Sequence, residues 1–188
     1  MRGLNGMRII SLGLVLCLSH SAFGMDKAKL VELYRNAKSL EVVMTQSKKA
    51  EYLMQPLKSR VRFVKTGKAI TWESLKPVPF LLRVSEGGEI SGDGLGPHFR
   101  LDSGTKKKVG GMVQFLNQIF SADFKAFEKQ YLLEFDGYVI KAKPKSNLAP
   151  FPYSLTMKFN KKLHLTHMIM ENDKETLSFV VESFDLKG

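Results

Sequence analysis

Cysteine and histidine are scarce in this chain of 188 residues, which has one cysteine, Cys17, and four histidines. A single cysteine excludes a disulfide within the chain. His164 and His167 are three residues apart in a segment with a strand pattern, so their side chains would point to opposite faces of a sheet. Such a pair does not share a metal ion, and two ligands are too few for a structural zinc site. We therefore expect no metal and no other cofactor.

The motifs of common catalytic sites are missing as well. The sequence has no G-x-S-x-G nucleophile elbow. The glycines between Gly92 and Gly96 lack the spacing and the following lysine of a phosphate-binding loop, so we expect a turn there. Carboxylates such as Asp123 and Glu128 have the pattern of solvated surface charges. We therefore expect a binding protein rather than an enzyme.

Ile9 to Leu18 is an apolar run, and it is far shorter than the roughly 20 residues that cross a bilayer. It follows Arg2 and Arg8 and precedes small residues that end at Gly24, which is the pattern of a secretory signal. We predict a signal peptide over residues 1–24, cleaved after Gly24, and one domain over residues 25–188. That domain would lack cysteine, which suits an oxidising compartment. The alternative is lipidation of Cys17, which would anchor the protein to a membrane.

Acidic residues are outnumbered, and the net charge is +11. Such a charge admits nucleic acid, an anionic membrane or an acidic protein as the partner. Secretion argues against nucleic acid, and the basic residues do not alternate with aromatic residues that could stack on bases. We expect no nucleic acid, and the charges either bind anionic lipid or an acidic protein, or only solvate the surface.

Alternation of apolar and polar residues is the clearest positive signal, and it runs from Leu57 to Ser85. A period of two with one apolar face is typical of a half-buried antiparallel strand. Short connections and two prolines divide this stretch into three neighbouring strands of one meander. The residues that share the apolar face are Leu57, Val61, Phe63, Ile70, Trp72, Phe80, Leu82 and Val84.

Two helices and further strands complete the pattern. Met25 to Ser39 predicts an amphipathic helix, and Leu40 to Ser47 predicts a strand that a polar loop over Lys48 to Pro56 follows. After Lys106 to Lys108, Val109 to Ser121 is apolar over most of its girth. That helix is either a core helix or one that sits in the mouth of the curved sheet and lines a cavity.

The C-terminal part predicts strands again. Tyr131 to Lys143 forms a hairpin about Gly137, and a strand from Tyr153 to Phe159 follows. In the next strand Leu163, Leu165 and Ile169 would share one face. In the last strand Leu177, Phe179 and Val181 would share one face. Together the pattern predicts ten or eleven strands and two main helices, an α+β fold that is mainly β.

The order of these elements resembles the LolA family of periplasmic outer-membrane lipoprotein carriers, especially its divergent LolA-like members. The resemblance rests on an N-terminal helix, on Met44-Thr45-Gln46-Ser47, and on a basic-apolar strand. It continues with Ile70-Thr71-Trp72-Glu73, a proline break, Leu82-Arg83-Val84-Ser85 and a Gly-Gly turn. It covers most of residues 26–186. Gln46 matches a glutamine of the family's first strand, and Trp72 matches an aromatic before the proline break.

The resemblance implies an unclosed antiparallel half-barrel of about eleven strands, which helices cover as a lid. The space between sheet and lid would be a hydrophobic cavity for acyl chains. The cargo would be an acylated lipoprotein or a lipid, which a monomeric carrier takes from an inner-membrane donor complex to an outer-membrane acceptor. The residues expected to line the cavity are Met44, Val61, Phe63, Trp72, Leu82, Val84, Met112, Phe115, Leu116, Ile119, Phe120, Leu155 and Met157.

Methionine suits an interior that must adapt to its contents. We expect Met44, Met54, Met112 and Met157 to contribute to such an interior.

One position departs from the family pattern. The better-known carriers have an arginine-proline pair between the second and third strands, and that arginine ties the lid closed. Here Thr66 and Gly67 stand at the matching positions, between Lys65 and Lys68. Either another donor serves as the latch, or opening is governed differently, or the cargo is not a lipoprotein. In the last case the same fold would carry a free lipid or a polyene acyl product.

Two further alternatives differ in class. The apolar interior would be only a filled core if the protein is a structural or interaction module. The protein would be an anchored outer-membrane receptor if Cys17 is lipidated.

Overall fold

The computed structural model describes residues 25–94, 103–146 and 152–188. The predicted signal peptide with its cleavage site, Cys17 and His98 lie outside these ranges. The helices are α1 (Lys27–Arg35), α2 (Ser103–Phe120) and α3 (Phe124–Glu128). The strands are β1 (Ser39–Ala50), β2 (Leu57–Thr66), β3 (Ala69–Lys76), β4 (Phe80–Val84), β5 (Ile90–Asp93), β6 (Tyr131–Asp136), β7 (Val139–Pro144), β8 (Ser154–Phe159), β9 (Leu165–Glu171) and β10 (Glu175–Lys187).

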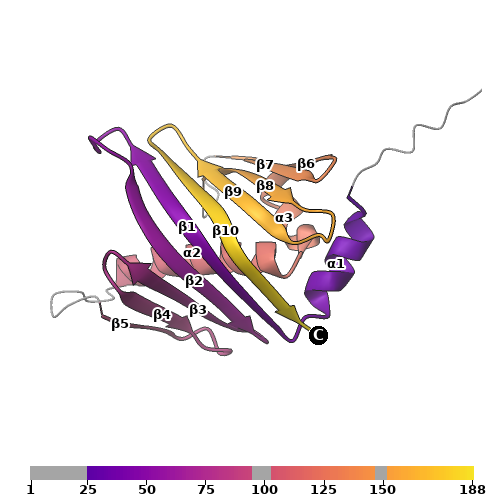
Figure 1. Ribbon diagram of the computed structural model, residues 1–188, viewed down its shortest axis with the longest axis horizontal. Helices are drawn as coiled ribbons and strands as arrows, with labels where there is room; N and C mark the ends of the chain where they lie inside the picture. The colour runs from indigo at the N-terminus through magenta and orange to yellow at the C-terminus, as the bar shows by residue number, and fades with distance from the viewer. Residues whose placement is uncertain (1–24, 95–102, 147–151) are drawn as a thin grey trace, which may run out of the picture.

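All ten strands described belong to one antiparallel sheet, in the order β5-β4-β3-β2-β1-β10-β9-β8-β7-β6. The first and last strands pair at the centre, and two meanders run from them to the edges. Figure 1 shows the sheet curved over α2, which runs across one face. The predicted mainly β fold, an unclosed half-barrel with covering helices, is confirmed.

Alternation separates the two faces of the sheet. Leu40, Val42 and Met44 of β1 are buried on the face that we call the inner face. The outer face carries ion pairs between strands, such as Arg62 with Glu41 at 2.8 Å. The apolar inner face is thus specified by the period of the strands, and part of the basic excess on the outer face is neutralised by neighbouring carboxylates.

Helix α1 closes one end of the half-barrel. It begins at Lys27, because the Asp26 carboxylate accepts hydrogen bonds from the amides of Ala28 and Lys29 at 3.0 and 3.2 Å. It ends at Arg35, so the predicted range of Met25 to Ser39 was too long, and Ser39 already belongs to β1. The Tyr34 hydroxyl donates to the carbonyl of Leu163 at 3.2 Å, which ties α1 to the connection between β8 and β9.

An irregularity at the start of β9 overturns one predicted face. Lys158 pairs with His167 and Phe159 pairs with Leu165, so the register shifts between β8 and β9. The extra residue of this bulge reverses the alternation that follows it. Met168 and Met170 therefore lie on the inner face at 0% and 2% exposure, and the prediction for Ile169 was wrong.

Two other boundaries differ from the predictions, and one residue predicted on the apolar face is exposed. Strand β1 extends to Ala50, into the segment predicted as a loop. Helix α2 begins at Ser103 rather than Val109, since the three lysines before Val109 are good helix formers. Leu57 is 53% exposed although it begins β2, so it does not contribute to the interior. Among the described residues, no helix combines the length and the apolar character needed to cross a membrane.

Candidate functional site: the apolar interior beneath helix α2

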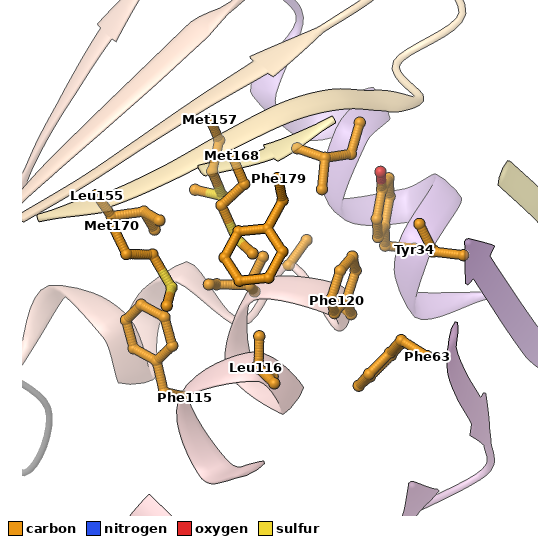
Figure 2. Close-up of a cluster of buried hydrophobic side chains, with 14 of the residues drawn as sticks. Tyr34, Phe63, Phe115, Leu116, Phe120, Leu155, Met157, Met168, Met170 and Phe179 are labelled. Atoms are coloured by element: carbon orange, nitrogen blue, oxygen red, sulfur yellow. The ribbon is translucent and has the colours of Figure 1, made fainter. Parts of the chain in front are cut away.

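The candidate site is the apolar cluster between the inner face of the sheet and helix α2. Strands from both meanders contribute to it, and α2 adds side chains at spacings of one and four residues, which lie on one helical face. Figure 2 shows Phe115 and Leu116 of α2 directed toward Leu155, Met157 and Met170 of the sheet. The cluster therefore joins residues that are far apart in the sequence.

The structure brings the predicted cavity residues together in this cluster. Eleven of the thirteen are at most 7% exposed, and the other two, Val84 and Met112, are partly buried and pack against the cluster. Their predicted role in lipid binding stays a prediction. The eleven buried residues are Met44, Val61, Phe63, Trp72, Leu82, Phe115, Leu116, Ile119, Phe120, Leu155 and Met157.

Aromatic rings connect the helix to the centre of the sheet. Phe120 of α2 stacks on Phe63 of β2 with ring centroids 4.5 Å apart. Phe63 meets Trp72 of β3 edge to face at 6.3 Å, and Trp72 meets Phe179 of β10 in the same way at 6.2 Å. Such pairs add about 0.5–1.5 kcal/mol each to the free energy of burial. The matched family aromatic, Trp72, is thus part of the interior.

A second aromatic group holds the C-terminal half of α2 against the edge of the sheet. Phe127 of α3 stacks on Tyr131 of β6 at 4.4 Å, and Phe115 lies 5.6 Å from Phe127 and 5.9 Å from Tyr131. Burial raises the pKa of Tyr131 to about 12, so its hydroxyl stays neutral at ordinary pH. Sequence analysis did not assign Phe127, Tyr131 or Phe179 to the site.

Methionines make up part of the interior. Met44 and Met157 were predicted there, and the bulge in β9 adds Met168 and Met170, which sequence analysis missed. Met54 was predicted to contribute and is instead fully exposed in the loop between β1 and β2. Unbranched thioether side chains change rotamer readily, so this part of the interior can repack around different contents.

Apolar contacts rather than charges hold the described part of α2. Its described side chains are residues 110–112 and 115–120, none of which is charged. Thr66, at the position of the family's latch arginine, ends β2 beside the turn at Gly67. Among the described residues, Lys27 of α1 forms an ion pair with Glu128 of α3 at 2.9 Å. Because apolar contacts are not directional, one apolar surface can replace another beneath α2.

The interior is filled with side chains in this conformation. The void bounded by Tyr34, Ile119 and Met157 has no room for a water molecule. A separate hollow of about 380 Å³ lies between the β3–β5 edge and α2, lined in part by Ile70, Val84, Ile90, Gly110 and Asn117. The hollow is within the range of about 300–1,000 Å³ that small-molecule sites occupy, and it adjoins the cluster at Val84.

The pKa shifts of three described titratable groups near the interior are caused mainly by burial. Burial raises the pKa of Tyr34 and lowers the pKa of Lys65. His164 stacks on Phe184 at 4.7 Å, and burial followed by the charge of Lys162 lowers its pKa. Within the described ranges, no three His, Cys, Asp or Glu residues are grouped so that they could hold a metal ion. The described residues of this site can therefore bind a ligand mainly through apolar contacts.

Comparisons with known proteins give matches among solved structures. No family model matches the chain, and no curated protein matches it. A LolA superfamily protein from Nitrosomonas europaea is 11% identical with a TM-score of 0.39, covering 88% of this chain and 95% of that one. A DUF1329 family protein from Desulfovibrio piger is 9% identical with a TM-score of 0.35, covering 86% and 90%.

A third solved structure is a candidate outer-membrane lipoprotein-sorting protein domain from Vibrio parahaemolyticus, 10% identical with a TM-score of 0.35, covering 87% of this chain and 92% of that one. Likeness at this level carries no argument about what this chain binds. The open antiparallel sheet with its covering helices is the fold that the resemblance in sequence implied.

Proposed function

We propose that this protein is a non-enzymatic carrier that shelters acyl chains between its sheet and helix α2. In this proposal it works in the periplasm, takes an acylated lipoprotein from an inner-membrane donor and releases it to an outer-membrane acceptor. One observation carries the proposal: among the described residues, the side chains buried between the sheet and the helices are apolar apart from Ser74, and the described side chains of α2 carry no charge.

The physical need for such a shelter is large. Each methylene costs about 0.8 kcal/mol when it is moved from an apolar site into water, so a chain of 16 carbons costs roughly 12 kcal/mol. A carrier must hide that surface and still release it. If acyl chains replace the side chains of α2 on the inner face, one apolar contact is exchanged for another, which keeps binding reversible.

Because the interior is filled, helix α2 and the cargo must move in a fixed order. Cargo cannot enter the closed cluster, so α2 must first move away from the sheet. We place the first opening at the hollow between β5 and Gly110 of α2, because glycine weakens the helix there by about 1 kcal/mol relative to alanine and Val84 connects the hollow to the cluster.

A second candidate keeps the carrier and changes the cargo to a free lipid or a polyene acyl product. The presence of Thr66 at the position of the family's latch arginine favours it, because closure of the lid then differs from that of the better-known carriers. Both candidates require the same apolar shelter and differ in the molecule that co-purifies with the protein.

The experiment that tests the proposal is lipid extraction and mass spectrometry of the protein purified from a native envelope without detergent. Acylated peptides support lipoprotein transport, and free lipids support the second candidate. A variant with Phe115→Asp and Ile119→Asp should lose the bound acyl chains, whereas Val180→Asp, on the exposed outer face at 47% exposure, should retain them. An empty extract, together with no uptake of a fluorescent fatty acid, would show that the interior is only a core.

A further inference from the structure

Lys48 and Glu175 form an ion pair that stands apart from the others described. The Lys48 Nζ lies 2.6 Å from Glu175 Oε2, and the two side chains are only 28% and 16% exposed. The other ion pairs described all lie at more exposed positions, such as Arg60 with Glu182 at 49% and 34%. Because burial weakens screening by solvent, the electrostatic attraction between these two charges is stronger than in a surface pair.

The pair lies on the inner face, in line with the apolar cluster. Lys48 follows Val42 and Met44 along β1 at even steps, so it points to the same side of the sheet. Glu175 precedes Phe179 on β10 at an even step. Helix α1 closes the opposite end of the half-barrel, where β1 begins. Along the inner face, the apolar surface therefore ends at two opposite charges.

Each charge has a second partner besides the other charge. The Tyr153 hydroxyl donates a hydrogen bond to the Glu175 carboxylate. The Lys48 ammonium lies 5.7 Å from the centroid of the Tyr52 ring, within the range of a cation–π contact. These second partners are neutral, so each charge keeps a contact when the ion pair opens but still lacks a group of opposite charge.

The chemistry of the pair selects a ligand with both charges. An anion that displaced Glu175 from Lys48 would leave a partly buried carboxylate without its cation, and a cation would leave the ammonium without its anion. A zwitterion satisfies both groups, since its phosphate contacts Lys48 and its ammonium contacts Glu175. A head group that is neutral or only anionic gains less at this site.

We propose that Lys48 and Glu175 bind the zwitterionic head group of a phosphoethanolamine lipid while its acyl chains lie on the apolar inner face. This inference rests on the proposed carrier function and deepens it, because it assigns a cargo class. It favours the free phospholipid over a lipoprotein whose acylated N-terminus carries no such head group. Tyr153 acts as a positioning residue that holds the carboxylate when Lys48 turns toward the phosphate.

The test uses vesicles with equal amounts of phosphatidylethanolamine and phosphatidylglycerol that have the same acyl chains. The purified protein is incubated with them and separated by size, and its bound lipids are counted by mass spectrometry. We expect the wild-type protein to bind phosphatidylethanolamine about fivefold or more over phosphatidylglycerol. Lys48→Gln and Glu175→Gln should each bring that ratio close to one while acyl chains are still bound.

Two further variants separate recognition from stability. The exchange of Lys48→Glu with Glu175→Lys keeps both charges at the site and should restore the preference. Glu41→Gln removes one member of the outer-face pair with Arg62 and should leave the preference unchanged. Equal binding of both lipids by the wild type, or a preference that survives both single substitutions, would overturn the head-group site and leave the carrier function intact. Absence of bound lipid of either kind would overturn both.

Discussion

Phe63 is the side chain through which sheet and covering helix are joined. It is fully buried, stacks on Phe120 at 4.5 Å and meets Trp72 edge to face at 6.3 Å. A ring in this position stabilises the fold through its buried apolar area and through two aromatic contacts. Its loss would leave a cavity that the sheet cannot collapse to fill, because the backbone around it is paired on both sides.

We expect Phe63→Ala to lower the free energy of unfolding by about 3–5 kcal/mol, the cost of an aromatic cavity in a core. Urea unfolding followed by circular dichroism measures this loss. Val180→Ala, on the exposed outer face, should change stability by about 0.5 kcal/mol or less. A loss below about 1 kcal/mol for Phe63→Ala would mean that α2 relaxes into the space and is more mobile than the packing implies.

The charge of Glu175 should make stability depend on pH. The hydrogen bond from Lys48, and next that from Tyr153, lowers the pKa of Glu175 below its ordinary value of 4.5. A group whose folded pKa is depressed stabilises the fold above its unfolded pKa, and this contribution is lost as the pH falls through the folded pKa. The stabilisation should therefore be complete at pH 7 and fade below about pH 4.5.

We expect Glu175→Gln to destabilise the protein at pH 7 by about 1.5–3 kcal/mol, the range for a hydrogen bond to a charged group. At pH 3 the difference from the wild type should shrink, because the wild-type carboxyl is then largely protonated. Urea unfolding of both proteins at the two pH values gives the comparison. A difference that is equal at pH 7 and pH 3 would contradict a role for the charge.

At the scale of single residues, alternation predicted the inner face well where strands are regular. Met44, Phe63 and Leu155 are buried as the period requires. The method failed at Ile169, because the bulge that reverses the faces of β9 has no signature in that segment. It also failed at Met54, because methionine is apolar wherever it stands and its position in a projecting loop depends on tertiary structure.

At the scale of elements, helix and strand types were predictable and their ends were not. The two hydrogen bonds that the Asp26 carboxylate accepts fix the start of α1, and sequence analysis did not identify this cap. The early start of α2 was harder to predict, because a run of lysines is equally suited to a solvated loop and to an exposed helical turn. Glycines within α2 make this element less stable by itself than its length suggests.

Gly110→Ala tests that weakness. Alanine favours the helix by about 1 kcal/mol, and the added Cβ would meet Ile90 Cδ1 at 3.6 Å, an ordinary contact. We expect the variant to be more stable and to take up a fluorescent fatty acid more slowly, because α2 resists opening. Gly87→Ala, which adds a methyl group in the β4–β5 turn at 3.7 Å from Ser85, serves as the control. Faster uptake by Gly110→Ala would contradict a lid that opens at this point.

At the scale of the whole molecule, the sequence determines the faces of the half-barrel but not the distance between the sheet and its covering helix. The residues predicted for a cavity lie together between the sheet and α2, and in this conformation they fill the space that the cavity would occupy. Periodicity cannot distinguish a closed carrier from a core, since both require the same apolar surface. Only separation of α2 from the sheet distinguishes them.

A reversible cross-link tests that separation directly. In a Cys17→Ala background, Ile90→Cys on β5 and Gly110→Cys on α2 would place two thiols where the Cβ of residue 110 lies 3.6 Å from the end of the Ile90 side chain. A short bis-methanethiosulfonate reagent should join them and abolish uptake of the fluorescent fatty acid, and a reducing agent should restore it. Each single-cysteine variant, treated in the same way, should keep its uptake. If uptake continues when mass spectrometry shows the cross-link to be complete, cargo does not enter by separation of α2 from this edge, and the proposed opening between β5 and Gly110 is wrong.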